Sequence, residues 1–108
     1  MTAPGFDELI HAPTRLSLVS LLAATEWAGF QYLRDAAGLS DSALSKQLTT
    51  LEDAGYVEIH KSFVGRRART AVRLTPVGRR AFEAHVAALQ EIVARAGLTV
   101  VPDAAGPL

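Results

Sequence analysis

The chain has 108 residues, enough for one compact domain with a modest core and too few for two. About half of its residues are apolar and a fifth are charged, which is ordinary for a globular protein and argues against global disorder. Because it contains no cysteine, disulfides, thiolate zinc sites and a cysteine nucleophile are excluded, and its eleven basic and eleven acidic side chains leave no net charge.

The first third of the chain predicts helices around one short extended piece. The first twelve residues predict irregular chain or a short helix, and Pro13 suits the start of a clear helix because proline is favoured in a first helical turn. Residues 27–30, WAGF, predict a very short extended segment. Residues 31–37 predict a two-turn helix, which Gly38 would end with a left-handed cap.

The clearest helix signals lie in the middle of the chain. Ser40 is a suitable N-cap, and Gly55 follows the run as a terminator. Leu44, Leu48 and Leu51 recur at i, i+4 and i+7, so they share one face of a helix. The other face is small and polar, and it carries Ser42, Ser45, Lys46, Thr49 and Asp53.

Two alternating segments follow and predict a β-hairpin. Residues 56–63, YVEIHKSF, and residues 69–75, RTAVRLT, both alternate in the manner of half-buried strands. The connecting residues 64–68, VGRRA, contain Gly65 as the turn residue, so the two strands should pair antiparallel.

A long last helix is predicted after the hairpin. Thr75–Pro76 is an N-cap followed by proline at the first helical position, and the helix should run to about Ala96 before Gly97 ends it. Its length would be roughly 31 Å at 1.5 Å per residue. We therefore predict one domain over residues 1–97 and a loose C-terminal tail over residues 98–108.

The charges are segregated although they sum to zero. From Ile59 through Phe82 the chain contains seven lysines and arginines and no aspartate or glutamate. An ordinary solvated face has interleaved signs, whereas this segregation creates a local positive field and predicts a polyanionic partner. The seven cations are Lys61, Arg66, Arg67, Arg69, Arg73, Arg79 and Arg80.

The order of elements predicts a helix-turn-helix, because two helices flank the tight turn AGLS at residues 37–40. With GLSDSALSKQLTTLEDAGYVEI, the basic RRART and VRLTPVGRRAF, the chain resembles winged-helix transcriptional regulators of the MarR and ArsR kind, and most closely the short bacterial members. The resemblance covers about Pro13 to Val93. It implies an α+β, mainly helical fold with a two-stranded β-wing and a long C-terminal dimerisation helix.

The resemblance also implies a function. It predicts a homodimer that binds double-stranded DNA at a palindromic operator with half-sites about one helical turn apart. Repression is the favoured outcome, because blocking polymerase needs no extra activating surface. Two features depart from the relatives: the chain is shorter than typical MarR proteins and lacks their full set of terminal dimerisation helices, and it lacks the paired cysteines of metal-sensing ArsR proteins.

The DNA contacts are predicted on two elements. Small hydroxyls on the second helix would allow close approach to base edges, Ala43 could meet a thymine methyl, and Lys46 could reach a guanine edge or a phosphate. Gln47 lies nearer the buried edge. The predicted contacts on this helix are Ser42, Ala43, Ser45, Lys46 and Thr49. The wing arginines Arg66, Arg67 and Arg69 are predicted to meet the adjacent backbone or minor groove.

The last helix carries an apolar band that a small winged-helix body should not cover completely, so it predicts packing on a second copy. The band consists of Phe82, Val86, Leu89 and Val93. The aromatic residues are expected in the core; they are Trp27, Phe30, Tyr32 and Tyr56. The histidines lie far apart in the sequence with no ligand-like spacing, so neither a metal site nor a catalytic role is predicted for His11, His60 or His85.

Other functional classes remain as alternatives. A winged-helix protein-interaction module without direct DNA binding is the runner-up, although such a module would not need a wing free of carboxylates. No arrangement of titratable groups predicts an enzyme, and no phosphate-binding loop predicts a cofactor. The sequence gives no indication of a small-molecule effector. No stretch is apolar for the roughly 20 residues that a membrane span needs, and a cytoplasmic protein is expected.

Overall fold

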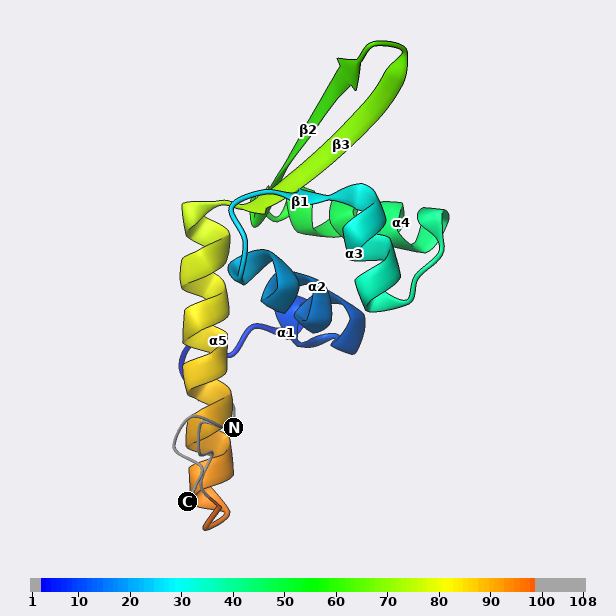
Figure 1. The fold of residues 1–108 in the computed structure, drawn as a ribbon. Coiled ribbons are helices and arrows are strands. Elements are labelled where there is room, and N and C mark those ends of the chain that lie inside the picture. Colours follow the sequence, from blue (N-terminus) through cyan, green and yellow to red (C-terminus); the bar gives the residue numbers. More distant parts are fainter. Residues whose placement is uncertain (1–2, 99–108) are drawn as a thin grey trace, which may run out of the picture.

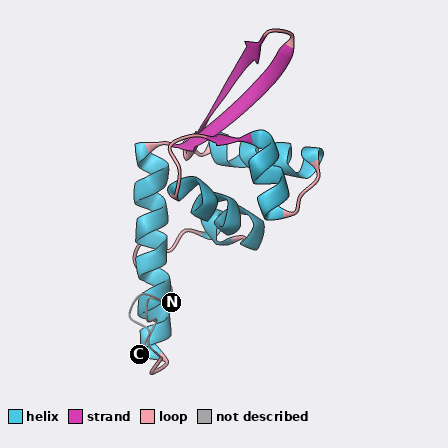
Figure 2. Ribbon diagram, viewed as in Figure 1, coloured by secondary structure: helices cyan, strands magenta, loops and turns pink. Residues whose placement is uncertain are grey.

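The computed structural model describes residues 3–98, and within them the predicted elements are present (Figure 1). In chain order they are α1 (Glu8–His11), α2 (Pro13–Ala23), β1 (Ala28–Gly29), α3 (Phe30–Ala37), α4 (Asp41–Asp53), β2 (Val57–Val64), β3 (Arg67–Leu74) and α5 (Pro76–Arg95). Figure 2 shows a mainly helical body from which the β2–β3 hairpin projects, so the predicted fold class is confirmed. Most of the predicted tail lies outside the described residues. None of the described helices is long and apolar enough to cross a membrane.

The sheet has one strand more than the predicted wing. Its order is β1-β3-β2, and the two-residue strand β1 pairs antiparallel with the base of β3 through Ala28 and Val72. The hairpin is also longer than predicted, because only Gly65 and Arg66 form the turn. Gly65 has a φ of 64°, which glycine adopts without strain. Arg67 therefore begins β3 and does not lie in a five-residue connection.

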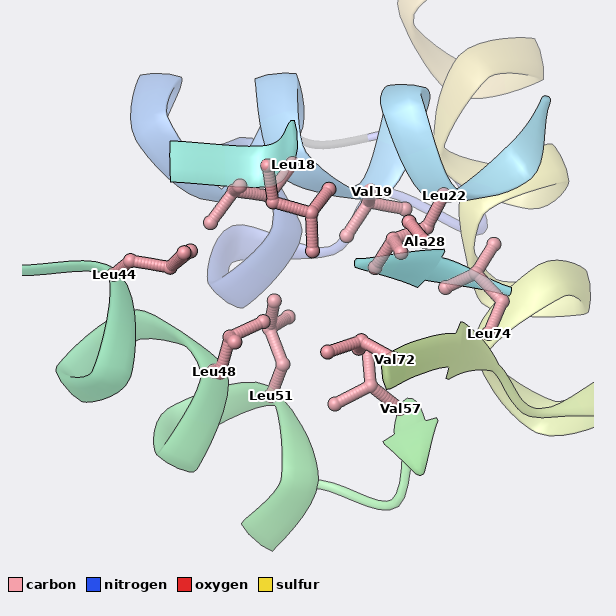
Figure 3. Close-up of a cluster of buried hydrophobic side chains, with 11 residues drawn as sticks. Leu18, Val19, Leu22, Ala28, Leu44, Leu48, Leu51, Val57, Val72 and Leu74 are labelled. Atoms are coloured by element: carbon pink, nitrogen blue, oxygen red, sulfur yellow. The ribbon is translucent and has the colours of Figure 1, made fainter. Parts of the chain in front are cut away.

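The core lies between α2, α4 and the base of the sheet (Figure 3). The three leucines of the predicted stripe on α4 have side chains that are at most 2% exposed, and they point toward Leu18 and Leu22 of α2 and toward Val72 of β3. Their burial confirms the predicted face of α4. Since that face is fixed against the core, the opposite face of the helix must point outward.

The turn between α3 and α4 is built as the sequence predicts. Gly38 has a left-handed φ of 68° and ends α3. The Ser40 hydroxyl accepts a hydrogen bond from the backbone N–H of Ala43 and caps α4. An ion pair between Arg34 and Asp41, at 2.8 Å, joins the two helices across the turn.

The start of α5 is packed directly against the chain that enters the wing. The Thr75 hydroxyl caps the helix by accepting from the backbone N–H of Gly78. The backbone N–H of Thr75 donates to the carbonyl oxygen of Tyr56, at 3.0 Å. A Cβ atom on Gly78 would overlap that same carbonyl group. Glycine is therefore needed here for close approach of two backbones, and this contact sets where α5 begins relative to the wing.

Two of the three histidines lie together, contrary to the expectation from their sequence separation. His85 of α5 is completely buried. Its Nδ1 accepts from the backbone N–H of Asp7, at 2.9 Å, so its ring proton lies on Nε2 and points to Nδ1 of His11, at 3.2 Å. Burial lowers the pKa of His85, and His11 adds to this effect. His85 is thus a neutral, hydrogen-bonded residue in the packed face of α5.

The same cluster reaches the junction between α4 and the wing. The Asp7 carboxylate caps α1 through the backbone N–H groups of Leu9 and Ile10, and it accepts a short hydrogen bond from the Tyr56 hydroxyl. This hydrogen bond, together with burial, raises the pKa of Tyr56 to about 12. A chain of polar contacts therefore ties the N-terminal segment to both α5 and the base of the wing.

Replacement of Gly78 by alanine tests the close contact at the start of α5. Gly→Ala within a helix normally stabilises by about 1 kcal/mol. Here we expect Gly78→Ala to destabilise by about 2 kcal/mol, because the added methyl meets a backbone carbonyl that cannot move without displacing the wing. Thermal unfolding should show a melting temperature lower by roughly 10 °C. The neighbouring, exposed Val77 provides the control, since Val77→Ala should change the melting temperature little. A more stable Gly78→Ala protein would contradict the packing.

Candidate nucleic-acid interface

The outward face of α4 carries the polar side chains that the sequence places there. Ser42, Ser45, Lys46 and Thr49 are all exposed. Ala43 and Gln47 are half-buried, and the side-chain oxygen of Gln47 accepts a hydrogen bond from Arg15 of α2, at 2.9 Å. The hydroxyl of Thr49 donates to the carbonyl of Ser45, so its methyl and its oxygen lone pairs remain available at the surface.

The two faces of the wing differ in composition. Partners in an antiparallel ladder point to the same side, and positions alternate along each strand. Arg67, Arg69 and Arg73 therefore share one face with their partners Val64, Ser62 and Glu58. The opposite face carries Lys61 and Phe63 with their partners Thr70 and Ala68. Arg66 lies in the turn between the strands. The predicted wing arginines are thus divided between the tip and one face.

Two grooves lie between the wing and the helices beneath it. The first, here called the α3 groove, is lined by the start of α3 and by one edge of the wing, and it includes Trp27, Tyr32, Arg34, Arg67 and Arg69. The second, the α4 groove, lies between α4 and the other face of the wing, and it includes Ser45, Thr49, Glu52, Ile59 and Lys61.

The two grooves are continuous, because Phe30, Asp41 and Thr70 line both of them. Figure 1 shows the hairpin rising on the side of the body where α3 and α4 lie and pointing away from the lower end of α5. The wing and the polar face of α4 therefore border one concave surface, on which Ser45 and Thr49 of α4 line one part and Arg67 and Arg69 of the wing line the other.

The base of the wing is held by an aromatic and an ionic contact. The guanidinium of Arg73 lies over the ring of Trp27, at 4.9 Å, and pairs with Glu58 of the facing strand, at 2.7 Å. The ring of Trp27 also contacts His60. Through these contacts Arg73 braces the base of the wing against the segment that precedes β1.

The aromatic residues were expected in the core, and for two of them this is wrong. Trp27 is 41% exposed and Tyr32 is 51% exposed, and both line the α3 groove. Phe30 and Tyr56 are half-buried. Aromatic content alone does not distinguish a core residue from one that lines a groove, because both lie beside apolar neighbours in the sequence.

The sequence leaves the role of Lys61 open, and the structure places its side chain on the wing face that borders α4. The alternation of the strand predicts this position, because Lys61 is four residues from the buried Val57 and therefore points to the same face of the strand. Two carboxylates lie on the same surface: Glu52 lines the α4 groove, and Asp41 is already paired with Arg34.

The apolar band of α5 lies beside the face that packs on the body. The fully buried positions of the helix are Gly78, His85 and Ala88, whereas Phe82, Val86, Leu89 and Val93 are all half-buried. In Figure 1 the lower part of α5 continues past α1 and α2. Near the C-terminal end of the helix Ile92 is 37% exposed, and Leu98, beyond the helix end, is 62% exposed. The described part of the chain thus leaves apolar surface uncovered along the end of α5.

Comparison with known proteins agrees with this geometry. The winged helix DNA-binding domain family matches residues 14–93, from α2 almost to the end of α5. An uncharacterised protein of Methanocaldococcus jannaschii, MJ0432, is 32% identical over 79 residues, which cover 73% of this chain and 86% of that protein. The chain belongs to the winged-helix DNA-binding domain family.

Solved structures place this winged-helix domain among transcriptional regulators. A transcriptional regulator homologue from Pyrococcus horikoshii OT3 superposes with a TM-score of 0.79 over 85% of this chain and 91% of that one, at 23% identity. A MarR family regulator from Silicibacter pomeroyi DSS gives a TM-score of 0.65 over 90% of this chain and 64% of that one, at 26% identity. The predicted MarR-like resemblance is confirmed, but it is not confined to bacteria, since two of these relatives are archaeal.

Proposed function

We propose that this winged-helix transcriptional regulator binds a palindromic operator as a homodimer and represses transcription. In each copy α4 enters the major groove, and the wing reaches the adjacent backbone and minor groove. The observation that carries the proposal is the continuous concave surface bordered by α4 and the wing. A helix with a small polar outward face can approach base edges closely, and a hairpin beside it can follow the duplex past the major groove.

The charge distribution supports phosphate contact by the wing. Arg66, Arg67 and Arg69 are exposed, and among the described residues none of them forms an ion pair. Arg34 and Arg73, in contrast, are already neutralised by carboxylates. The unpaired guanidinium groups can therefore displace counterions from DNA without first breaking a protein contact.

The residues of α4 have separate roles in this proposal. Ser42, Ser45 and Thr49 supply hydrogen-bonding groups at short range, and Lys46 supplies a longer reach to a guanine edge or a phosphate. Ala43 is half-buried and offers only a methyl contact. Sequence preference should therefore depend on α4, and overall affinity should depend more on the wing.

The salt dependence of DNA binding tests the role of the wing. The double substitution Arg67→Ala, Arg69→Ala should weaken binding to all duplexes and reduce the slope of log K against log salt by about two units, because two phosphate contacts are lost. Fluorescence anisotropy with labelled duplex at several salt concentrations measures the slope. Arg95→Ala provides the control, since Arg95 carries the same charge but pairs with Glu91 at the far end of α5.

The same titrations separate the wing from α4. Lys46→Ala should change the ranking of duplexes if the ammonium group contacts a base edge, whereas the wing variant should lower all affinities by a similar factor. An unchanged salt slope in the wing variant would refute the phosphate contacts. Absence of binding to any duplex at low salt would favour a protein-interaction module.

The dimer is proposed to form along the uncovered part of α5. The band of Phe82, Val86, Leu89 and Val93 is only half-buried within one copy, and it is continuous with the exposed Ile92. Pairing two such helices would cover this surface and place two α4 helices on the same side of the dimer. A twofold arrangement requires the operator to be palindromic, with half-sites about one helical turn apart.

A charge on this band tests the dimer. Val93 lies near the C-terminal end of α5, beyond Ala88, the last buried residue of the helix, so Val93→Glu should leave the fold intact while it raises the dimer dissociation constant at least tenfold. Sedimentation equilibrium measures this constant. Ala94→Glu is the matched control, because Ala94 is the next residue and is exposed on a different side of the helix. Equal dissociation constants for the two variants would exclude this interface.

A further inference from the structure

The tip of the wing carries an exposed apolar surface that the phosphate contacts do not explain. Phe63 is 74% exposed and Val64 is 59% exposed, and Phe63 exposes the larger fraction of the two. Every residue from Lys61 through Arg69 is exposed. The hairpin projects from the body at this point (Figure 2), so the body cannot cover the phenyl ring. A hairpin that served only to hold arginines would not need an aromatic ring there.

The ring lies on the wing face that borders the α4 groove. Phe63 has the same strand parity as Ile59 and Lys61, which line that groove beside Ser45 and Thr49 of α4. At about 3.4 Å per residue, Phe63 lies roughly 14 Å beyond Ile59 along the strand. Half a turn of B-DNA, which separates a major groove from the adjacent minor groove, is about 17 Å. The displacement of the ring from the level of Ile59 is thus close to the distance between the major groove and the adjacent minor groove of a duplex.

The charges around the ring indicate a polyanion as its partner. Lys61 lies on the same face of the strand, Arg66 lies in the adjacent turn, and no carboxylate lies in the sequence from Ile59 through Phe82. Apolar side chains held among cations are suited to the minor groove, whose walls of deoxyribose are apolar and whose edges are lined with phosphates. An apolar side chain that inserts between two base pairs in the minor groove partly unstacks that base step.

We propose that Phe63 is an apolar wedge that enters the minor groove beside each half-site and opens one base step. This inference rests on the proposed DNA binding and adds a source of specificity that needs no hydrogen bond to a base. Unstacking is easiest at pyrimidine–purine steps such as TA and CA/TG. Phe63 therefore selects a flexible step at a fixed distance from the bases that α4 contacts, and the duplex bends there.

Selection of duplexes from a random pool by the full chain tests the wedge. The wild-type protein should enrich sequences with a pyrimidine–purine step flanking each half-site. Phe63→Ala should lose that flanking preference, keep the half-site read by α4, and bind the wild-type consensus about ten- to hundredfold more weakly. Val64→Ala is the matched control: Val64 is the adjacent exposed apolar residue, but it points to the opposite face of the hairpin. Its selection should match the wild type.

A second measurement reports the unstacking directly. With 2-aminopurine at the selected step, the wild-type protein and Val64→Ala should both increase its fluorescence, and Phe63→Ala should not. Because Phe63 is exposed, equal melting temperatures for the three proteins are expected and would show that the differences do not arise from folding.

The possible failures are distinguishable. If the wild type enriches no duplex, the proposed DNA binding itself fails, and the wedge fails with it. If the wild type enriches a palindrome and Phe63→Ala enriches the same flanks with the same fluorescence change, DNA binding stands and the wedge is wrong. A uniform loss of affinity without a change in flanking preference would also overturn the wedge, because it would indicate contact with the backbone alone.

Discussion

Burial of three leucines on one side of α4 is the constraint on which the rest of the surface depends. Leu44, Leu48 and Leu51 are packed against α2 and the sheet, so α4 cannot rotate about its axis without exposing them. Full burial of one such side chain contributes about 1.5–3 kcal/mol, and exposing all three would cost much of the stability of a small domain. The outward position of the polar residues on α4 follows directly, because at 100° per residue they have no other direction available.

The wing is positioned by a second set of contacts at its base. Strand β1 adds a ladder to β3, Arg73 is held between Trp27 and Glu58, and the carbonyl of Tyr56 receives the start of α5. Toward the tip, every side chain from Lys61 to Arg69 is exposed. The hairpin therefore has a fixed base and a free tip. That arrangement suits an element that must meet a duplex at a set place while its tip adapts to the groove.

Much of this architecture could be predicted from the sequence because it depends on residues that are close together in the chain. The caps at Ser40 and Thr75, the terminator Gly38 and the leucine stripe of α4 depend only on residues a few positions apart, and all are confirmed. The grooves and the contact between His11 and His85 join residues far apart in the sequence, which no periodicity encodes. Gly78 was visible as part of a motif, but the need for glycine there comes from the backbone of Tyr56, which only the folded structure supplies. The assignment of α4 and wing residues to DNA contacts remains a prediction.

Binding as proposed requires α4 and the wing to contact the same duplex at the same time. Amide chemical shifts of the full chain, recorded with and without a selected duplex, test this most directly. We expect the largest changes in two separate stretches, Ser42–Thr49 and Lys61–Arg69, at the same DNA concentration. Changes confined to one of these stretches, or to the outward face of α5, would contradict a common surface formed by the two elements.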